Sequence, residues 1–312
     1  MSTLSFPRAR YEPGIADFGN GCFAYLQPDG GWGLSNSGLV TSDGEALLID
    51  TMFDYAHTRA MLDGFRRASP AKIRALFNTH HNGDHCYGNA LVEGAEIIAT
   101  EGAKTAMTHE TPEGLARLMK VAPGMGLTGE YFLHCFGRFE FDGIEQKLPD
   151  HTFHGRLKKT VGAKAIELIE VGPAHTGGDA IYHFERAHVV HMGDLLWLQF
   201  HPRVDRPAGA SIQNWLKTLE TVSRDMPRDT IYIAGHAKQG VGVTADVRAV
   251  TNFRDYFDAV LTTVRKGLAA GKSKAEITAT PLPQFASYQT SGSALSLPAV
   301  LGVAYDELSP AG

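Results

Sequence analysis

The sequence predicts a layered α/β fold for this 312-residue chain, and two patterns support the prediction. Short apolar segments alternate with segments in which apolar residues recur at helical spacing. Three of the apolar segments end at a glycine that lies next to a histidine or an aspartate. Layered α/β folds carry functional residues at strand ends, because the sheet holds each strand rigidly while the following loop can vary. The pattern therefore places the candidate site at the ends of strands.

The residue pattern in the first third of the chain predicts a hairpin, a helix and two further strands after an irregular start. The hairpin turn is Asp43-Gly44, a dipeptide typical of tight turns between strands. Asp54 can cap a helix in which Tyr55, Leu62 and Phe65 share one face. The elements expected here are strands at 38–41, 46–51, 73–77 and 96–100, and a helix that begins after Asp54.

Residues from about 102 to 150 predict an irregular, aromatic-rich insertion. Thr111-Pro112-Glu113 favours a helix start, but the proline and glycines between 123 and 129 interrupt the helical pattern. The aromatic residues that follow are Tyr131, Phe132, Phe136, Phe139 and Phe141. Such a segment can cover an apolar cleft, or it can be a satellite hydrophobic cluster. Both interpretations stay open.

The second half repeats the strand pattern and then becomes helical. Ser211 caps an expected helix, and the helical C-terminal part begins at about residue 245. Ser273 and Glu276 form a capping box that opens a short helix. The strands expected in this half are 165–171, 180–184, 188–191 and 230–234. No linker or low-complexity tract divides the chain, so we expect a single domain over residues 1–312.

Composition and charge disfavour several functional classes. The chain is 43% hydrophobic and 20% charged, as in globular proteins, and its net charge of −5 gives no electrostatic attraction for nucleic acid. Its three cysteines include no Cys-x-x-Cys pair, so a disulfide framework or a cysteine zinc knuckle is not indicated. No signal peptide or bilayer-spanning segment is recognised, and a cytoplasmic protein without a membrane partner is expected.

Residues 78–89 are the densest group of chemically active side chains. They contain His80, His81, Asp84 and His85, and imidazole with carboxylate suits zinc, iron or manganese. Gly83 and Gly88 allow the sharp turns that bring such closely spaced residues to one point. Neither a Gly-x-Ser-x-Gly elbow nor a catalytic cysteine motif is found, and Cys86 beside His85 is interpreted as a packed small residue.

Five motifs in sequence order resemble those of the metallo-β-lactamase superfamily, over roughly residues 33 to 240. The family loop Thr-His-x-His-x-Asp-His stands here as Thr79-His80-His81-Asn82-Gly83-Asp84-His85. The other motif residues are His175 in Pro-Ala-His-Thr-Gly-Gly-Asp, Asp194 in Met-Gly-Asp, His236 in Ala-Gly-His, and Asp50 in Leu-Leu-Ile-Asp-Thr. The resemblance implies a four-layer αββα sandwich built from two similar halves.

The resemblance also implies a ligand set and a catalytic residue. One metal position would be held by His80, Asn82 and His175, the other by Asp84, His85 and His236, with Asp194 bridging them. The cofactor expected is zinc, as one or two ions, with iron or manganese as alternatives. Asp84 would be catalytic, by orienting or deprotonating the attacking water, and Asp50 would support the loop from behind.

Asn82 departs from the family, which has histidine at that position. An amide oxygen is a weaker donor to zinc than imidazole, so three interpretations are open: a loosely bound first ion, a single ion at the second position, or a metal harder than zinc. His81 is expected to point outward or to support a ligand. Asp179 is expected to support His175 or to stabilise its turn.

The function that the resemblance implies is metal-dependent hydrolysis. A metal-bound hydroxide would cleave an ester, lactone, thioester or amide bond in a small, partly apolar metabolite. Two alternatives remain: an iron-dependent oxidative enzyme on the same fold, and a non-catalytic protein in which Asn82 marks a decayed site. The expected partner is therefore a small-molecule substrate, and the oligomeric state is left open.

Overall fold

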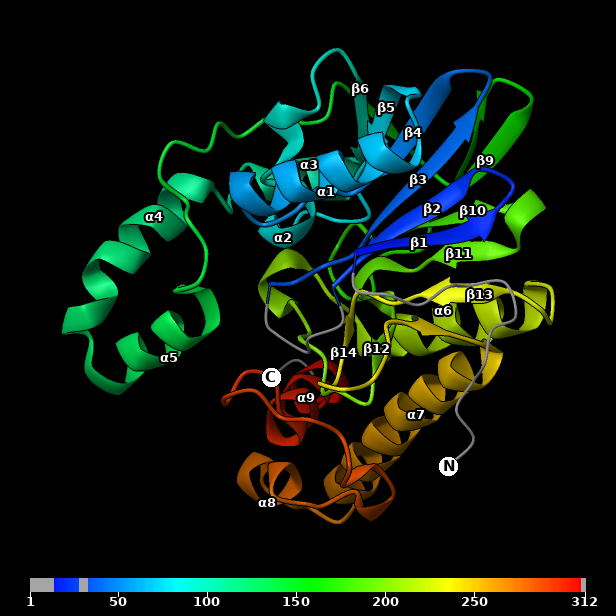
Figure 1. Cartoon of the computed structure of the whole chain (residues 1–312). Coiled ribbons are helices and arrows are strands. Elements are labelled where there is room, and N and C mark those ends of the chain that lie inside the picture. The colour runs from blue at the N-terminus through cyan, green and yellow to red at the C-terminus, as the bar shows by residue number, and fades with distance from the viewer. Residues whose placement is uncertain (1–13, 28–32, 310–312) are drawn as a thin grey trace.

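Two mixed β-sheets pack face to face, and helices cover the outer side of each, in the computed structural model, which describes residues 14–27 and 33–309 (Figure 1). This arrangement confirms the expected four-layer αββα sandwich. The first sheet has the order β1 (Gly14–Gly19), β2 (Cys22–Leu26), β3 (Ser37–Ser42), β4 (Glu45–Ile49), β5 (Lys72–Phe77), β6 (Glu96–Thr100) and β7 (His151–Phe153). The second has the order β15 (Thr244–Ala245), β13 (Ile231–Ile233), β11 (Val189–His191), β10 (Ala180–Phe184), β9 (Lys164–Glu170) and β8 (Arg156–Val161).

Strand direction follows the connections along the chain. β1 to β4 pair antiparallel, with short turns joining β1 to β2 and β3 to β4, whereas β4, β5, β6 and β7 pair parallel and need longer crossovers. In the second sheet β11 and β13 are parallel and the remaining pairs are antiparallel. The sequence analysis left β1, β2, β7 and β8 unrecognised, because these strands are short or carry polar residues on an exposed face.

Alternation along β4 shows why the first sheet is buried on both faces. Leu47 and Ile49 belong to the core between the two sheets. Ala46 and Leu48 point the other way and pack against α1 (Tyr55–Ala68), which contributes Phe65 to that second core. A nearly continuous apolar run is the sequence pattern of a strand covered on both sides, and it is what the four-layer architecture requires.

The outer face of the second sheet is covered by α6 (Ile212–Asp225) and α7 (Val247–Ala269) (Figure 1). Trp215 of α6 packs against Phe257 of α7, with ring centroids 4.7 Å apart. The chain then ends in α8 (Lys274–Thr278) and α9 (Leu297–Leu308), which pack on α7. The predicted caps are confirmed: the side chains of Asp54, Ser211 and Ser273 each accept a hydrogen bond from the first turn of their helix.

The insertion contains the helix expected after Thr111, but as a whole it is more regular than the expected irregular segment. α3 (Glu101–Met107) is followed by α4 (Pro112–Val121) and α5 (Gly126–Phe136), and the last two form an arm that projects from the sandwich (Figure 1). A Cβ at Gly129 would lie 1.7 Å from the carbonyl oxygen of Ala122. The glycine that was interpreted as a helix breaker thus allows the two helices to approach closely.

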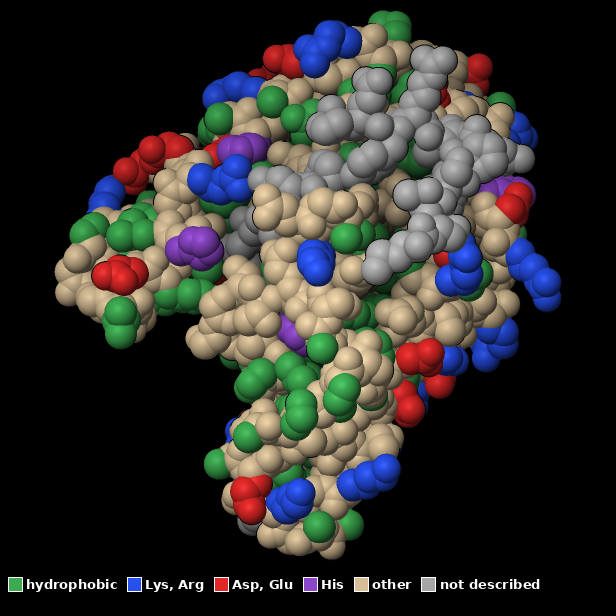
Figure 2. All heavy atoms as spheres, turned by 60° about the horizontal axis from the view of Figure 1, so that its bottom comes forward, with side chains coloured by type: hydrophobic (Ala, Val, Ile, Leu, Met, Phe, Trp, Pro, Cys, Tyr) green, Lys and Arg blue, Asp and Glu red, His purple; other side chains and the backbone are tan. Residues whose placement is uncertain are grey.

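Large hydrophobic side chains reach solvent on this arm (Figure 2). Within the described residues, the exposed large hydrophobics are Val121, Met125, Leu127 and Leu133. The arm also encloses its own buried cluster, which includes Phe53, Phe136 and Phe141. Among the helices of residues 14–27 and 33–309, none combines the length and apolar character that crossing a bilayer requires.

Replacing Phe257 by alanine tests the contribution of the core beneath the second sheet. The side chain is fully buried, and its loss should leave a cavity between α6 and α7 that lowers the free energy of unfolding by about 3–5 kcal/mol. Urea unfolding followed by circular dichroism measures the change. Leu127→Ala is the control, since Leu127 is 83% exposed and its loss should cost less than about 0.5 kcal/mol. Equal urea midpoints for the two variants would contradict the assignment of Phe257 to the core.

Candidate metal centre

The loop that leaves β5 carries the first group of candidate ligands. His80 lies in the loop itself, and the chain then forms the short helix α2 (Gly83–Cys86), which presents Asp84 and His85. Gly83 and Gly88 pack tightly: a Cβ on Gly88 would lie 2.1 Å from Oγ1 of Thr58. Neither glycine has a positive φ, so both serve the close packing of the loop against its neighbours and not the sharp turns that the sequence predicted.

Asp50 supports this loop from behind. Its backbone has φ +58°, a left-handed conformation that aspartate tolerates better than most residues, and its side chain is fully buried. Oδ1 accepts a hydrogen bond from the backbone N–H of Thr79 at 2.7 Å. Oδ2 accepts from Oγ1 of Thr79 and from Nδ1 of His85, both at 2.8 Å. The carboxylate thereby orients His85 with Nε2 directed away from Asp50.

His175 is held by the turn that follows β9. Asp179 accepts hydrogen bonds from the backbone N–H groups of Ala174 and Thr176 and from Oγ1 of Thr176. It therefore stabilises the turn that carries His175, which is one of the two roles expected for it. Nδ1 of His175 lies 2.9 Å from the backbone carbonyl oxygen of Arg203, to which it donates. Its Nε2 is left facing the loop after β5.

Asp194 and His236 come from two neighbouring strand ends of the second half. Asp194 lies in the 3₁₀ turn η4 (Gly193–Leu195) after β11, and His236 begins β14 (His236–Ala237), which pairs with β12 (Trp197–Leu198). Nδ2 of Asn36 donates to the carbonyl oxygens of Ala234 and Gly235, so a residue of the first half positions the His236 strand. A Cβ on Gly235 would lie 2.1 Å from Oδ1 of Asp194.

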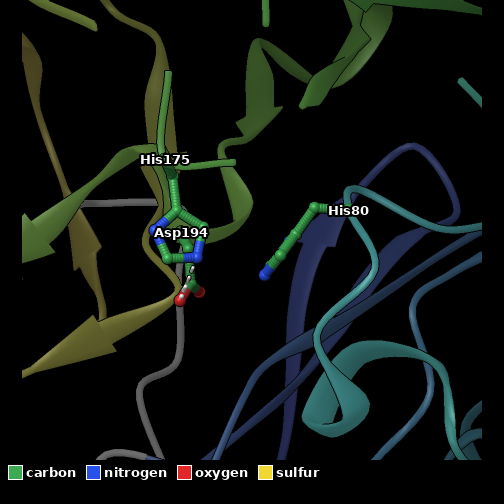
Figure 3. Close-up of side chains that lie close together, drawn as sticks. All are labelled: His80, His175 and Asp194. Atoms are coloured by element: carbon green, nitrogen blue, oxygen red, sulfur yellow. Dashed lines mark ion pairs between the residues drawn. The ribbon is translucent and has the colours of Figure 1, made fainter. Parts of the chain in front are cut away.

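The structure brings the predicted ligands into two adjacent groups. The donor atoms of His80, His175 and Asp194 lie within 4.8 Å of one another (Figure 3), and so do those of Asp84, His85 and His236. Asp194 contacts both groups. Its Oδ2 is 3.4 Å from Nε2 of His175 and 3.2 Å from Nε2 of His236, and its Oδ1 is 3.1 Å from Nε2 of His85. All of these residues are buried.

The pKa of each buried histidine in the site depends on the charged groups that lie next to it. Burial, together with the nearby His85, holds the pKa of His80 well below its usual value, so His80 is neutral. Burial also opposes charge on His85 and His236, but the carboxylates of Asp84 and Asp194 raise the pKa of both. Burial disfavours the charged form of Asp194, yet His236 and His85 hold the pKa of this carboxyl well below its ordinary range.

The donor atoms fit a divalent cation. Oγ1 of Thr79 donates to Asp50 and so accepts from Nδ1 of His80, which leaves Nε2 of His80 as the unprotonated nitrogen. That Nε2 is buried and has no hydrogen-bond partner among the described residues. Nε2 of His85 and Oδ1 of Asp194 face each other at 3.1 Å, within ion-pair distance but without a well-aligned hydrogen bond among the described residues. Buried polar atoms are almost always paired, so the unpartnered Nε2 of His80 beside the carboxylate of Asp194 supports a position for an ion.

Asn82 lies next to the first ligand group, and its amide oxygen and amide nitrogen face different neighbours. Its Oδ1 is 2.9 Å from Nε2 of His175, whereas its Nδ2 faces His81, Glu110 and Asp205. His81 is buried and does not point outward, and its Nε2 lies 3.6 Å from Glu110 and 3.7 Å from Asp205. Partial burial raises the pKa of Glu110, but contacts with His81, Arg203 and Asn82 lower it to about 2.

A cavity of about 330 Å³ opens beside the two ligand groups. Its polar wall includes Asn82, Asp84, Glu110, Asp194, Arg203 and His236, and its apolar wall includes Phe53, Tyr87, Leu115, Leu118, Phe132 and Phe136. The apolar wall comes largely from α4 and α5, so the insertion lines this cleft. It also forms a hydrophobic cluster of its own, and both interpretations of its aromatic residues therefore apply. Cavities of this kind are typical small-molecule sites.

The sequence analysis missed some residues of the site and assigned others correctly as structural. Asn36, Glu110, Arg203 and Asp205 belong to no recognised motif, and their sequence neighbours carried no signal of their position. Cys86 is packed as expected: burial raises the pKa of its thiol, and its Sγ donates to the carbonyl oxygen of His81.

Comparisons with known proteins agree with this geometry. The sequence profile of the Metallo-beta-lactamase superfamily matches residues 30–236. A metallo-beta-lactamase type 2 from Bacteroides fragilis is 20% identical over 212 residues, which cover 67% of this chain and 72% of that protein.

Two solved structures extend the likeness to the fold. The inverting sec-alkylsulfatase Pisa1 from Pseudomonas sp. is 16% identical, with a TM-score of 0.69 over 95% of this chain, which spans 50% of the sulfatase. A metallo-beta-lactamase from Pontibacter korlensis is 14% identical, with a TM-score of 0.58 over 78% of this chain and 98% of that one.

Substituting Asp50 by asparagine tests its support of the metal centre. Asparagine also tolerates a positive φ, but it replaces one carboxylate oxygen by an amide nitrogen that cannot accept from Thr79 or His85. We expect the affinity for a divalent cation to fall about 10–100-fold, measured by titration against a competing chelator. Asp43→Asn is the matched control, because Asp43 has φ +52° at an exposed turn. Unchanged affinity in the Asp50 variant would contradict this role.

Proposed function

Because the chain belongs to the metallo-β-lactamase superfamily and is an enzyme of that family, we propose that it is a metal-dependent hydrolase of small, partly apolar metabolites. The bond that it cleaves is an ester, lactone, thioester or amide. The observation that carries the proposal is the position of the two ligand groups: they meet at Asp194 and border a cavity whose opposite wall is apolar.

The proposed ligand set follows the two groups. His80, Asn82 and His175 hold one ion, Asp84, His85 and His236 hold the other, and Asp194 bridges them. The donors suit zinc, with manganese or iron as alternatives. A divalent cation bound there would lower the pKa of a coordinated water to about 7 and polarise the bond to be cleaved.

Asp84 is the proposed catalytic residue. Its side chain is 11% exposed and borders the cavity, so it can contact both a water molecule and a substrate. Oδ2 lies 3.5 Å from Nε2 of His236 and 3.7 Å from Nε2 of His85, which supports the carboxylate as a ligand of the second position. From there it can orient the attacking water and accept its proton.

The cavity wall supports a substrate with an apolar part. Leu115 and Leu118 come from α4, and Phe132 and Phe136 come from α5. These side chains can bury an acyl or alkyl group while the scissile bond lies beside Asp84 and Asp194. They also exclude water from the bond, which strengthens electrostatic interactions in the site. Sulfate esters belong in the substrate panel as well, because a sec-alkylsulfatase shares the fold.

Asp84→Asn tests the catalytic assignment. The substitution keeps the size of the side chain but removes the negative charge, so kcat/KM should fall at least about 100-fold on the best substrate of a panel of lactones, thioesters, esters, amides and sec-alkyl sulfates. Asp63→Asn is the control, because Asp63 is an exposed residue of α1. Full activity of the Asp84 variant would refute the assignment, and iron-linked oxygen consumption without hydrolysis would favour the oxidative alternative.

A homologous series of acyl chains tests the apolar wall. Each added methylene that enters the cavity is expected to contribute about 0.8 kcal/mol, or about fourfold in kcat/KM, until the cavity is filled. Leu115→Asn should flatten this dependence, whereas Leu127→Asn on the exposed side of the same arm should not. A dependence that is identical in wild type and Leu115→Asn would show that the substrate binds elsewhere.

A further inference from the structure

Asn82 lies between the first ligand group and a buried polar group that the proposed reaction does not use. That polar group consists of His81, Glu110, Asp205 and Arg203. Asp205 is 2% exposed and His81 is 1% exposed, whereas Glu110 reaches the cavity. Buried carboxylates cost free energy unless they are paired, so their placement beside a single amide requires an explanation.

The amide of Asn82 is oriented by its neighbours. Nδ2 lies 3.4 Å from Oε2 of Glu110 and 3.4 Å from Oδ2 of Asp205, so its two N–H groups can donate to two carboxylates. The opposite orientation would place the amide oxygen against both carboxylates and the NH₂ group against His175. Electrostatic repulsion therefore selects the orientation in which Oδ1 faces His175.

The contact between Asn82 and His175 indicates a shared cation. Nδ1 of His175 donates to a backbone carbonyl oxygen, which makes Nε2 the ring nitrogen that presents a lone pair to a cation. That lone pair meets the lone pairs of Oδ1 of Asn82 at 2.9 Å. Two acceptors at this distance repel each other unless a cation lies beside both. Asn82 also precedes α2, but its side chain makes no capping hydrogen bond, so the usual structural role of asparagine before a helix does not apply.

The carboxylates have their own counter-charge, so they need no further ion. The Arg203 guanidinium is 3.0 Å from Oδ2 of Asp205 and 3.6 Å from Oε1 of Glu110. His81, Glu110 and Asp205 could together surround a cation, but the guanidinium already supplies that positive charge. Their other contacts are Nε2 of His81, at 3.6 Å and 3.7 Å, and the NH₂ group of Asn82.

We propose that Glu110 and Asp205 are positioning residues that hold the amide oxygen of Asn82 toward the first metal position. The inference rests on the proposed function, and it names the cation class of that position. One carbonyl oxygen, two imidazoles and a bridging carboxylate are a harder donor set than the first position would have with histidine at residue 82. The first position therefore favours zinc over manganese or ferrous iron less strongly than it would with histidine there.

A double-mutant cycle on metal affinity tests this inference. The purified full chain is titrated with Mn²⁺ or Zn²⁺ against a chelator, and bound ions are counted by native mass spectrometry. Glu110→Gln should weaken Mn²⁺ at the first position at least about tenfold and leave the second position unchanged. Asn82→His should increase the ratio of Zn²⁺ affinity to Mn²⁺ affinity at the first position.

The decisive measurement is Glu110→Gln in the Asn82→His background. If Glu110 acts through the amide, the tenfold effect should disappear there, because imidazole needs no such orientation. An equal loss in both backgrounds, no loss in either, or an absence of bound ions would overturn the inference. Glu113→Gln, an exposed glutamate of the same helix start, is the control and should change neither affinity.

Hydrolytic activity is measured separately from metal affinity, so the inference and the proposed function can fail independently. A chain that shows the coupling but hydrolyses no member of the substrate panel would retain the positioning role and lose the hydrolase proposal. A hydrolytically active chain without the coupling would lose only the positioning role. A urea unfolding curve of Glu110→Gln that coincides with the wild-type curve establishes that the fold is intact.

Discussion

The buried carboxylate of Asp50 is the interaction on which the metal centre depends. It lies just after β4, and its hydrogen bonds to Thr79 and His85 fix the loop that leaves the neighbouring strand β5. A charge without solvent access is stable only when its oxygens are fully paired, and here the partners are the loop itself. The left-handed backbone of Asp50 is maintained because these contacts over-determine its position.

The sandwich joins ligands that lie far apart in the chain. The first half contributes His80, Asp84 and His85, and the second half contributes His175, Asp194 and His236, so neither half holds all of the candidate ligands. The core between the sheets holds the two halves together, and Asn36 links them directly by donating to the backbone before His236. Asp194 then lies at the point where both groups meet.

The insertion gives this common fold its own cavity. α4 and α5 carry apolar side chains to one wall, and Glu110, just before α4, approaches the amide of Asn82. The segment that shapes the cavity thus also contacts the residue at which the ligand set departs from the family. Such an arrangement allows substrate selection and metal environment to change together when this segment changes.

The sequence by itself determined the strand-end motifs, because spacing and periodicity are local properties. Its resemblance to the metallo-β-lactamase superfamily then implied the αββα architecture and the candidate ligands His80, Asp84, His85, His175, Asp194 and His236. It could not show that α5 continues through glycines, since the fit of Gly129 against Ala122 depends on two helices meeting. Nor could the sequence reveal that Glu110, Asp205 and Arg203 lie around the side chain of Asn82. Their side chains come from separate loops, and only the packing of the folded chain brings these charges within contact of one amide.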